Sequence, residues 1–370
     1  MIEKKQSHLE IKADSHPGVG GKQNEDRYRV CSCQLSPKDK TPSSLAVLCD
    51  GIGGHKAGEI AAQMGVSIIT EKILKSEGKN PLDIIEKAVL SASEAIYQTS
   101  QSDQGQSGMG ATAAVAWIVG DRLYTANLGD SRIYLLRGGH IIQLTTDHTW
   151  VQEAYEKGLI DEADRVDHPN AHVIRRYLGA KTPPNPDFRM WFFEGESDSE
   201  ARENQGLRLK PGDTLLLCSD GLTDLVGDRE IQEVIQNNTL DAAVDKLIGI
   251  ANGRGGYDNI TVILMKVSSE GIFKKPKQRR LYLGCLLILI VLSALITAFI
   301  LGWRWWQNRM NNIELQTPRV TDTITAETDD FRVTETPSAE ITLKSTEGQA
   351  TGLPTQGPTI TPWPTNTSSP

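Results

Sequence analysis

Two short segments of the chain share a design in which an apolar run ends in Asp-Gly. Residues 45–49 (LAVLC) lead into Asp50, and residues 215–219 (LLLCS) lead into Asp220, with a glycine after each Asp. An Asp at the end of a buried strand stands on a rigid support, and glycine lets the backbone approach whatever that Asp holds. Asp-Gly is also a common turn dipeptide, but its repetition after two similar runs favours functional carboxylates.

Other acids stand at comparable boundaries of apolar runs: Glu25, Asp26, Asp130, Asp224 and Asp258. No His or Cys accompanies them at ligand spacing, so the cations that suit them are Mg²⁺ or Mn²⁺ rather than Zn²⁺. Carboxylates that converge in a cleft repel one another and shift their pKa values, and divalent ions relieve this repulsion. A pair of such ions can activate a water for attack on phosphorus. Spacing alone does not show that these acids converge.

The elements that must position these acids are predicted to be strands in hairpins and helices in separate blocks. Apolar spacing predicts helices over residues 57–75, 81–98, 228–236 and 240–251. Apolar runs predict strands over residues 27–33, 45–49, 188–193, 214–218 and 260–267, and further hairpin strands between 110 and 143. Hairpins with helices in separate blocks favour an α+β domain, in which two antiparallel sheets are covered by helices.

The composition limits the class of protein. The formal net charge of −8 argues against a nucleic-acid binder, which usually shows a basic face. The cysteines form no CxxC pair, and this usage fits a reducing compartment. Residues 1–268 read as one soluble domain.

The C-terminal part reads as a membrane anchor and a tail. Residues 281–303 are 23 residues without a charge, which is enough for a transmembrane helix. A basic linker (269–280) precedes this helix, and Trp303, Trp305 and Trp306 stand at its other end. The positive-inside rule predicts a cytoplasmic domain at the cell membrane and an outer C-terminus. Residues 304–370, rich in Thr, Pro and Ser, are predicted to form a disordered extracytoplasmic tail.

The motifs together resemble a known family. In chain order they are Asn24-Glu25-Asp26, Asp50-Gly51-Ile52-Gly53-Gly54-His55 with Ala57-Gly58-Glu59, Gly110-Ala111-Thr112-Ala113, Gly129-Asp130-Ser131-Arg132, Leu144-Thr145-Thr146-Asp147-His148, Leu178-Gly179-Ala180, Pro211-Gly212-Asp213, Ser219-Asp220-Gly221-Leu222-Thr223-Asp224 and Asp258-Asn259-Ile260-Thr261. Over residues 8–267 the chain resembles the PPM family of metal-dependent protein phosphatases (the type 2C phosphatases) in its bacterial form. Each motif is weak alone, and their common order makes the match specific.

The resemblance implies a four-layer αββα sandwich with a two-metal centre, holding Mn²⁺ or Mg²⁺, between the sheets. It implies hydrolysis of phosphoserine and phosphothreonine in proteins by a water that two metal ions activate. The implied site residues are direct ligands (Asp26, Asp50, Asp220 and Asp258), a backbone carbonyl (Gly51), a residue acting on water (Glu25) and holders of a third ion (Asp130 and Asp224). Residues 150–172 resemble the flap beside the cleft.

The chain departs from the family pattern at one position. Where the family usually has a phosphate-binding Arg, this chain has Gly21, followed by Lys22. Lys22 either binds the substrate phosphate as a point charge, without bidentate geometry, or is an ordinary exposed lysine. His55 is expected to be structural, and His148, His168 and His172 are expected on the surface or in the flap.

Two other functions remain open from the sequence. The first is a pseudophosphatase, in which the same fold serves as a membrane-tethered binding or sensor module. The presence of every expected carboxylate favours the enzyme over this module. The second is an adaptor whose outer tail binds a ligand. Family analogy suggests phosphorylated proteins and membrane Ser/Thr kinases as partners.

Overall fold

The computed structural model describes residues 1–4, 7–21, 23–53, 56–102, 104–165, 168–268 and 279–314. The chain divides into two units, Met1–Gly284 and Cys285–Pro370. The first unit holds two large antiparallel sheets, and the second holds most of one long helix.

The first sheet has six strands in the order β1-β3-β4-β7-β8-β11. They are β1 (Ile2–Glu3), β3 (Arg27–Gln34), β4 (Pro42–Cys49), β7 (Ala113–Val119), β8 (Arg122–Leu128) and β11 (Leu207–Arg208). The second sheet has five strands in the order β10-β9-β12-β13-β2. They are β2 (Leu9–His16), β9 (Arg132–Arg137), β10 (His140–Gln143), β12 (Thr214–Cys218) and β13 (Ile260–Val267). A small ladder pairs β5 (Gly51–Ile52) with β6 (Gly110–Ala111).

The central strands contain continuous apolar runs because both of their faces are covered. On β4, Leu45 and Val47 face the core under the helices, while Ala46 and Leu48 face the core between the sheets. The same division holds on β12, where alternate residues belong to the inter-sheet core and to the core on the helix side. This double burial turns the alternating pattern of a half-exposed strand into a continuous apolar run.

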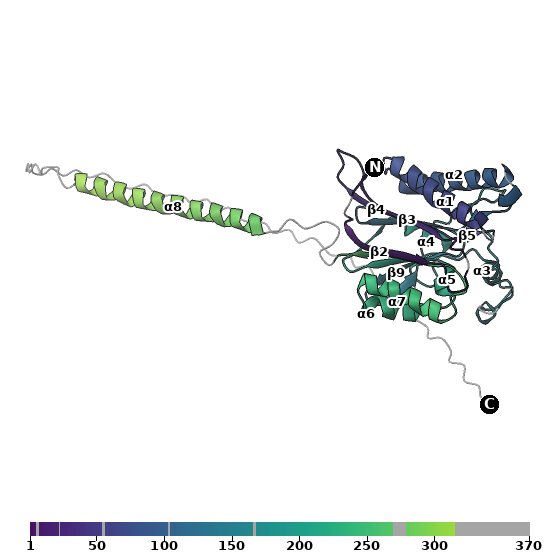
Figure 1. Cartoon of the computed structure of the whole chain (residues 1–370). Coiled ribbons are helices and arrows are strands. Elements are labelled where there is room, and N and C mark those ends of the chain that lie inside the picture. Colours follow the sequence, from purple (N-terminus) through teal and green to yellow (C-terminus); the bar gives the residue numbers. More distant parts are fainter. Residues whose placement is uncertain are drawn as a thin grey trace, which may run out of the picture. The chain divides into compact units, whose positions relative to one another are not determined.

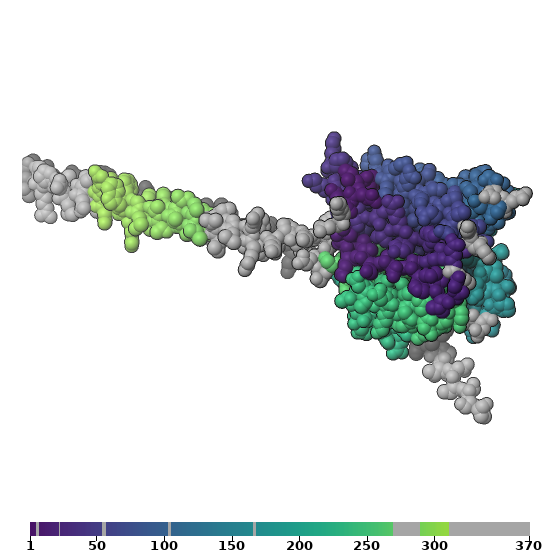
Figure 2. All heavy atoms as spheres, viewed as in Figure 1, coloured from purple at the N-terminus to yellow at the C-terminus, as the bar shows by residue number. Residues whose placement is uncertain are grey.

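Helices form the outer layers, so the αββα sandwich expected from the sequence is confirmed. Figure 1 shows α1 (Lys56–Lys75) and α2 (Pro81–Ser102) over the first sheet, with α6 (Asp228–Asn237) and α7 (Leu240–Gly253) on the opposite side of the second. In Figure 2 the blue and green helical layers lie on either side of the purple N-terminal strands. Shorter helices lie in the connections: η1 (Gln104–Gln106), α3 (Trp150–Glu156), η2 (Glu162–Asp164), α4 (Asp198–Glu203) and α5 (Asp220–Thr223).

One strand prediction is wrong, and the edge strand β2 was not predicted. Residues 188–193 form no strand, because their backbone groups bond to scattered partners: Met190 N–H donates to the carbonyl of Ala201, and Trp191 N–H donates to that of Leu144. Strand β2 lies at the edge of the second sheet and pairs only with β13. Among its residues only Leu9 is buried, so β2 carries almost no apolar pattern.

One helix of the described residues is long and apolar enough to cross a membrane. Helix α8 (Arg279–Glu314) contains a candidate span, Leu289–Met310, of 22 residues with a mean hydropathy of 1.7. The predicted span 281–303 falls within α8. The predicted linker lies outside the described residues except for Arg279 and Arg280, and so does the predicted tail beyond residue 314.

Candidate metal centre

The two Asp-Gly segments lie at the ends of central strands in different sheets. Asp50 follows β4, and its N–H donates a 2.8 Å hydrogen bond to the hydroxyl of Thr112. Asp220 follows β12 by one residue and begins α5. Each carboxylate therefore stands on a strand that its own sheet holds from both sides.

Asp26 and Asp258 stand at the beginnings of strands, just before β3 and β13. Asp26 is 2% exposed. Its Oδ2 accepts hydrogen bonds from the hydroxyls of Ser219 (2.7 Å) and Thr261 (2.6 Å). Asp258 is exposed, and its Oδ1 accepts a 2.8 Å hydrogen bond from the N–H of Asn259. Because neighbouring strands are antiparallel, the start of one strand and the end of the next meet at the same sheet edge.

The structure brings these four carboxylates together. The side chain of Asp26 interacts directly with that of Asp50, and the side chain of Asp50 interacts with that of Asp220. Burial raises the pKa of Asp26 to about 6 and that of Asp220 to about 7, and repulsion from Asp258 adds to both shifts. Burial and repulsion from Asp26 also raise the pKa of Asp50 well above its usual value. The cluster is therefore a concentration of negative charge, in which the carboxylates raise one another's pKa.

The donor set fits hard divalent cations. Asp26, Asp130 and Asp220 each have a buried Oδ1 without a hydrogen-bond partner among the described residues. A buried carboxylate oxygen of this kind is costly unless it meets a positive charge. Oxygen ligands from several carboxylates are what Mg²⁺ and Mn²⁺ prefer.

Asp130 and Asp224 lie near Asp220. Asp130 is 6% exposed, and burial together with repulsion from Asp220 raises its pKa well above the usual range. Asp224 faces His172 of the flap segment, with 3.5 Å between Asp224 Oδ2 and His172 Nδ1. His172, Asp220 and Asp224 each offer one ligand atom, and these atoms lie within 4.8 Å of one another. The imidazole of His172 is thus a further candidate ligand, beside Asp220 and Asp224, for an additional cation.

Glu25 and Gly51 lie where the start of α1 approaches the cluster. A Cβ on Gly58 would come within 2.2 Å of Glu25 Oε2, and a Cβ on Gly51 would come within 2.4 Å of the Gly58 carbonyl. Only glycine allows this close approach of two backbones and a carboxylate. Lys22 and His55 lie outside the described residues, so the structure does not place them.

Comparison with known proteins identifies the family. The family described as "Protein phosphatase 2C" matches residues 21–174. "Serine/threonine phosphatase stp" of Listeria innocua is 33% identical over 264 residues, which cover 70% of this chain and 95% of the relative. The chain belongs to the protein phosphatase 2C family.

Solved structures agree with this assignment. The Streptococcus agalactiae serine/threonine phosphatase is 32% identical, with a TM-score of 0.61 over 70% of this chain and all of that one. The catalytic domain of the phosphatase PstP in complex with two manganese ions is 31% identical, with a TM-score of 0.56 over 70% of this chain and 98% of that one.

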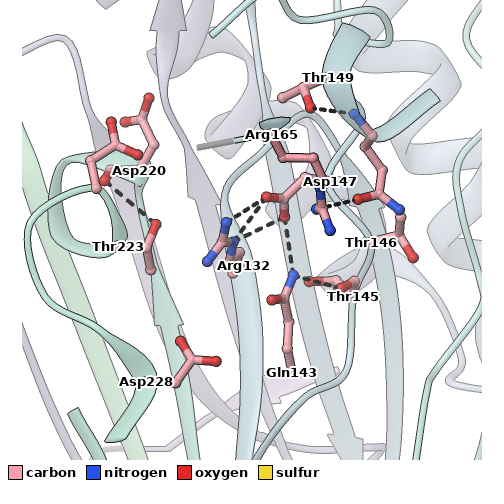
Figure 3. A network of polar contacts seen from close by, with 12 residues as sticks. Arg132, Gln143, Thr145, Thr146, Asp147, Thr149, Arg165, Asp220, Thr223 and Asp228 are labelled. Atoms are coloured by element: carbon pink, nitrogen blue, oxygen red, sulfur yellow. Dashed lines mark hydrogen bonds and ion pairs between the residues drawn. The ribbon is translucent and has the colours of Figure 1, made fainter. Parts of the chain in front are cut away.

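Arg132, for which the sequence predicts no role in this phosphatase 2C chain, is paired with an acid beside the cluster. Its guanidinium donates to both carboxylate oxygens of Asp147, at 3.0 Å from Nε and 2.7 Å from a terminal nitrogen. Figure 3 shows this pairing, with Gln143 contacting the same carboxylate. Arg132 also lowers the pKa of Asp224, although burial of Asp224 outweighs this effect. It is a fixed positive charge beside the acids of this family member.

His148 is buried, so its expected surface position is wrong. It is 3% exposed. Its Nδ1 accepts a 3.1 Å hydrogen bond from the N–H of Gly129, and its Nε2 lies 3.2 Å from Asp187 Oδ2. Because Nδ1 accepts, the proton of the neutral ring is on Nε2 and points to Asp187. His148 therefore holds the turn that presents Asp130. No local sequence signal distinguishes it from a surface histidine.

Proposed function

We propose that this chain is a metal-dependent phosphatase that hydrolyses phosphoserine and phosphothreonine in proteins. The observation that carries this proposal is the direct interaction of the carboxylates of Asp26, Asp50 and Asp220 in a member of the protein phosphatase 2C family. The serine/threonine phosphatase names of its relatives support it.

The direct ligands of two cations would be Asp26, Asp50, Asp220 and Asp258, with the backbone carbonyl of Gly51. Mn²⁺ or Mg²⁺ is proposed because the donors are oxygens and because a related catalytic domain binds two manganese ions. When bound, the ions supply Lewis acidity, which lowers the pKa of water and polarises phosphoryl oxygens. Asp130 and Asp224 are proposed to hold a third ion, and His172 is a further ligand for it.

The chain's own residues prepare the centre for this chemistry. Ser219 and Thr261 occupy one oxygen of Asp26, so the other is oriented toward the cluster. Glu25, held against Gly58, is proposed to orient the attacking water and accept its proton. Lys22 is proposed to contact the substrate phosphate as a point charge, and this contact remains a prediction.

The proposed organisation places this activity at the cell membrane. Residues 1–268 form the catalytic domain, 269–280 the basic linker, 281–303 the transmembrane helix and 304–370 the outer tail. The apolar helix α8 supports the anchor, and the basic linker supports a cytoplasmic catalytic domain. We expect the protein to remain in membranes after alkaline extraction. Release into the soluble fraction would contradict the anchor.

Phosphoproteins at the same membrane are the proposed substrates, among them Ser/Thr kinases whose signals the phosphatase would oppose. A membrane anchor raises the effective concentration of such substrates. A kinase with a phosphorylated cytoplasmic segment, placed in the same vesicles, should lose phosphate faster than when it is placed in separate vesicles. Equal rates would contradict the proposed advantage of membrane partners.

The activity is tested with the full chain in detergent, on p-nitrophenyl phosphate and on a phosphothreonine peptide. We expect turnover with Mn²⁺ that EDTA abolishes. Asp220→Ala should remove nearly all turnover while circular dichroism remains unchanged, and Asp245→Ala on the exposed face of α7 is the matched control. Turnover that survives EDTA would contradict the mechanism. Mn²⁺ binding without turnover would indicate the non-catalytic module instead.

A further inference from the structure

Two exposed apolar side chains, Val19 and Tyr257, lie on neighbouring loops beside the carboxylate cluster. Val19 is 59% exposed and Tyr257 is 69% exposed. The N–H of Val19 donates a 2.9 Å hydrogen bond to the carbonyl of Gly256, which joins the two loops. Tyr257 directly precedes Asp258, and the loop of Val19 leads into Glu25. The pair therefore stands at the rim of the candidate metal centre.

The backbones of the two loops are in direct contact, which fixes the position of the pair. Gly18 has φ +78°, and a Cβ there would lie 2.4 Å from the carbonyl oxygens of Gly256 and Asp258. The amide of Asn259 donates to the carbonyls of Pro17 (3.1 Å) and Gln23 (3.3 Å). Loops clamped in this way lose little further entropy on binding a partner.

The exposed ring of Tyr257 lies against the backbone of Gly255. A Cβ on Gly255 would lie 2.3 Å from Cζ of Tyr257, so the ring covers Gly255. Part of the ring is thus supported by the chain, and the exposed part is available to a ligand. A rigid aromatic ring supplies a large contact area at low entropic cost.

Single exposed apolar residues are common and need no explanation. This pair differs because a hydrogen bond joins its loops and because one member is next to Asp258. A substrate whose phosphate lies at the metal centre must lay its neighbouring residues across this rim. The carboxylates at the rim repel an acidic residue next to the phosphorylated residue of the substrate. An apolar substrate residue at the same place is favoured, because its contact with Val19 and Tyr257 removes apolar surface from water.

We propose that Val19 and Tyr257 form a subsite for a large apolar side chain next to the phosphorylated residue of the substrate protein. This inference rests on the proposed phosphatase function and narrows its substrates. The ligand class is a phosphoserine or phosphothreonine segment with Leu, Ile, Val or Phe beside the phosphoresidue. Val19 and Tyr257 are then specificity-determining residues, because they contact the substrate without touching its reacting atoms.

The test uses the full chain in detergent with Mn²⁺ and two phosphothreonine peptides that differ only in carrying Leu or Ser beside the phosphothreonine. Each kcat/KM is divided by the same variant's value for p-nitrophenyl phosphate, so any disturbance of the metal centre cancels. We expect the wild-type protein to prefer the Leu peptide by about tenfold. Tyr257→Ala and Val19→Ser should each reduce this preference to about threefold or less.

Two further variants separate the subsite from a general surface effect. Tyr257→Phe keeps the ring and should keep the preference. Phe193→Ala removes another exposed apolar side chain, 75% exposed and outside the proposed subsite, and should also keep it. Equal kcat/KM values for the two peptides in the wild-type protein, together with p-nitrophenyl phosphate turnover, would overturn the subsite alone. Absence of turnover on every substrate would overturn the phosphatase function and the subsite with it.

Discussion

The hydroxyl of Thr261 donates a 2.6 Å hydrogen bond to Oδ2 of Asp26, although 235 residues separate them in the chain. Ser219 donates to the same oxygen, while Asp26 Oδ1 is buried without a described hydrogen-bond partner. The two hydroxyls thus fix the orientation of the carboxylate and reserve one oxygen for a cation. Groups that orient a metal ligand commonly affect metal affinity nearly as strongly as the ligand itself.

Replacing Thr261 with Val should weaken Mn²⁺ binding by about tenfold, because Asp26 loses one of its two orienting donors. The measurement is calorimetric titration of the metal-free chain. Thr261→Ser keeps the hydroxyl and is the matched control, with affinity close to wild type. If the Val variant bound Mn²⁺ as tightly as the Ser variant, the orienting role of this hydrogen bond would be excluded.

The bidentate pair of Arg132 and Asp147 should stabilise the fold. The side chains are 26% and 12% exposed, so Arg132→Met leaves a mostly buried carboxylate without its partner. We expect a loss of about 3 kcal/mol in the free energy of unfolding. Urea unfolding followed by near-UV circular dichroism measures it.

The matched control is Arg229→Met, which breaks the exposed pair with Glu233, whose side chains are 93% and 58% exposed. This variant should change the free energy of unfolding by about 0.5 kcal/mol or less. Equal losses in the two variants would show that burial does not govern the contribution of Arg132.

The fold could be predicted largely from local patterns where burial is complete. The predicted strand 214–218 coincides with β12 (Thr214–Cys218). A strand that is buried on both faces has a continuous apolar run in its sequence, so it can be predicted from that run. Helices α6 and α7 likewise begin where predicted and end one and two residues later. The edge strand β2 was missed because tertiary pairing with β13, rather than its own apolar pattern, makes it a strand.

The residues of the candidate metal centre could likewise be predicted only in part from local sequence. Asp50 and Asp220 stand out locally, since an apolar run stops at each of them. Asp50 and Asp26 meet because β3 pairs with β4, whereas Asp220 reaches them only because the second sheet packs on the first. The contact of Ser219 with Asp26 joins residues 193 apart in the chain, which no local pattern encodes. His148 was misplaced for a related reason, because Asp187, its partner, lies 39 residues further along the chain.

His148 should be a stabilising residue of the turn before Asp130. His148→Ala removes the acceptor of the Gly129 N–H and the donor to Asp187, both in buried surroundings. Asp187 keeps its bonds from Arg189, so the Gly129 N–H is the group left unpaired, which costs about 1–3 kcal/mol. We therefore expect the free energy of unfolding to fall by roughly 2 kcal/mol, measured by urea unfolding. His140→Ala, at an exposed position on β10, is the control and should change it by less than about 0.5 kcal/mol. Similar values for both variants would refute the role of His148.

His8 should make the stability of the fold depend on pH. Burial lowers its pKa to about 4, against about 6.5 in an unfolded chain. Its Nδ1 lies 3.4 Å from the Ser44 hydroxyl, and its Nε2 is buried without a described partner. Between pH 6.5 and 4 the unfolded chain binds a proton that the folded chain does not. The contribution of His8 is therefore complete above pH 6.5 and is lost as the pH falls toward 4.

The variant His8→Gln cannot titrate and isolates this effect from the other ionisable groups. Between pH 7 and 4.5 the free energy of unfolding of the wild-type chain should fall by about 1–2 kcal/mol more than that of the variant, because part of the shift is screened by solvent. Urea unfolding at five pH values in EDTA measures both curves without metal binding. Parallel curves over this range would show that His8 has the same pKa in the folded and unfolded chains.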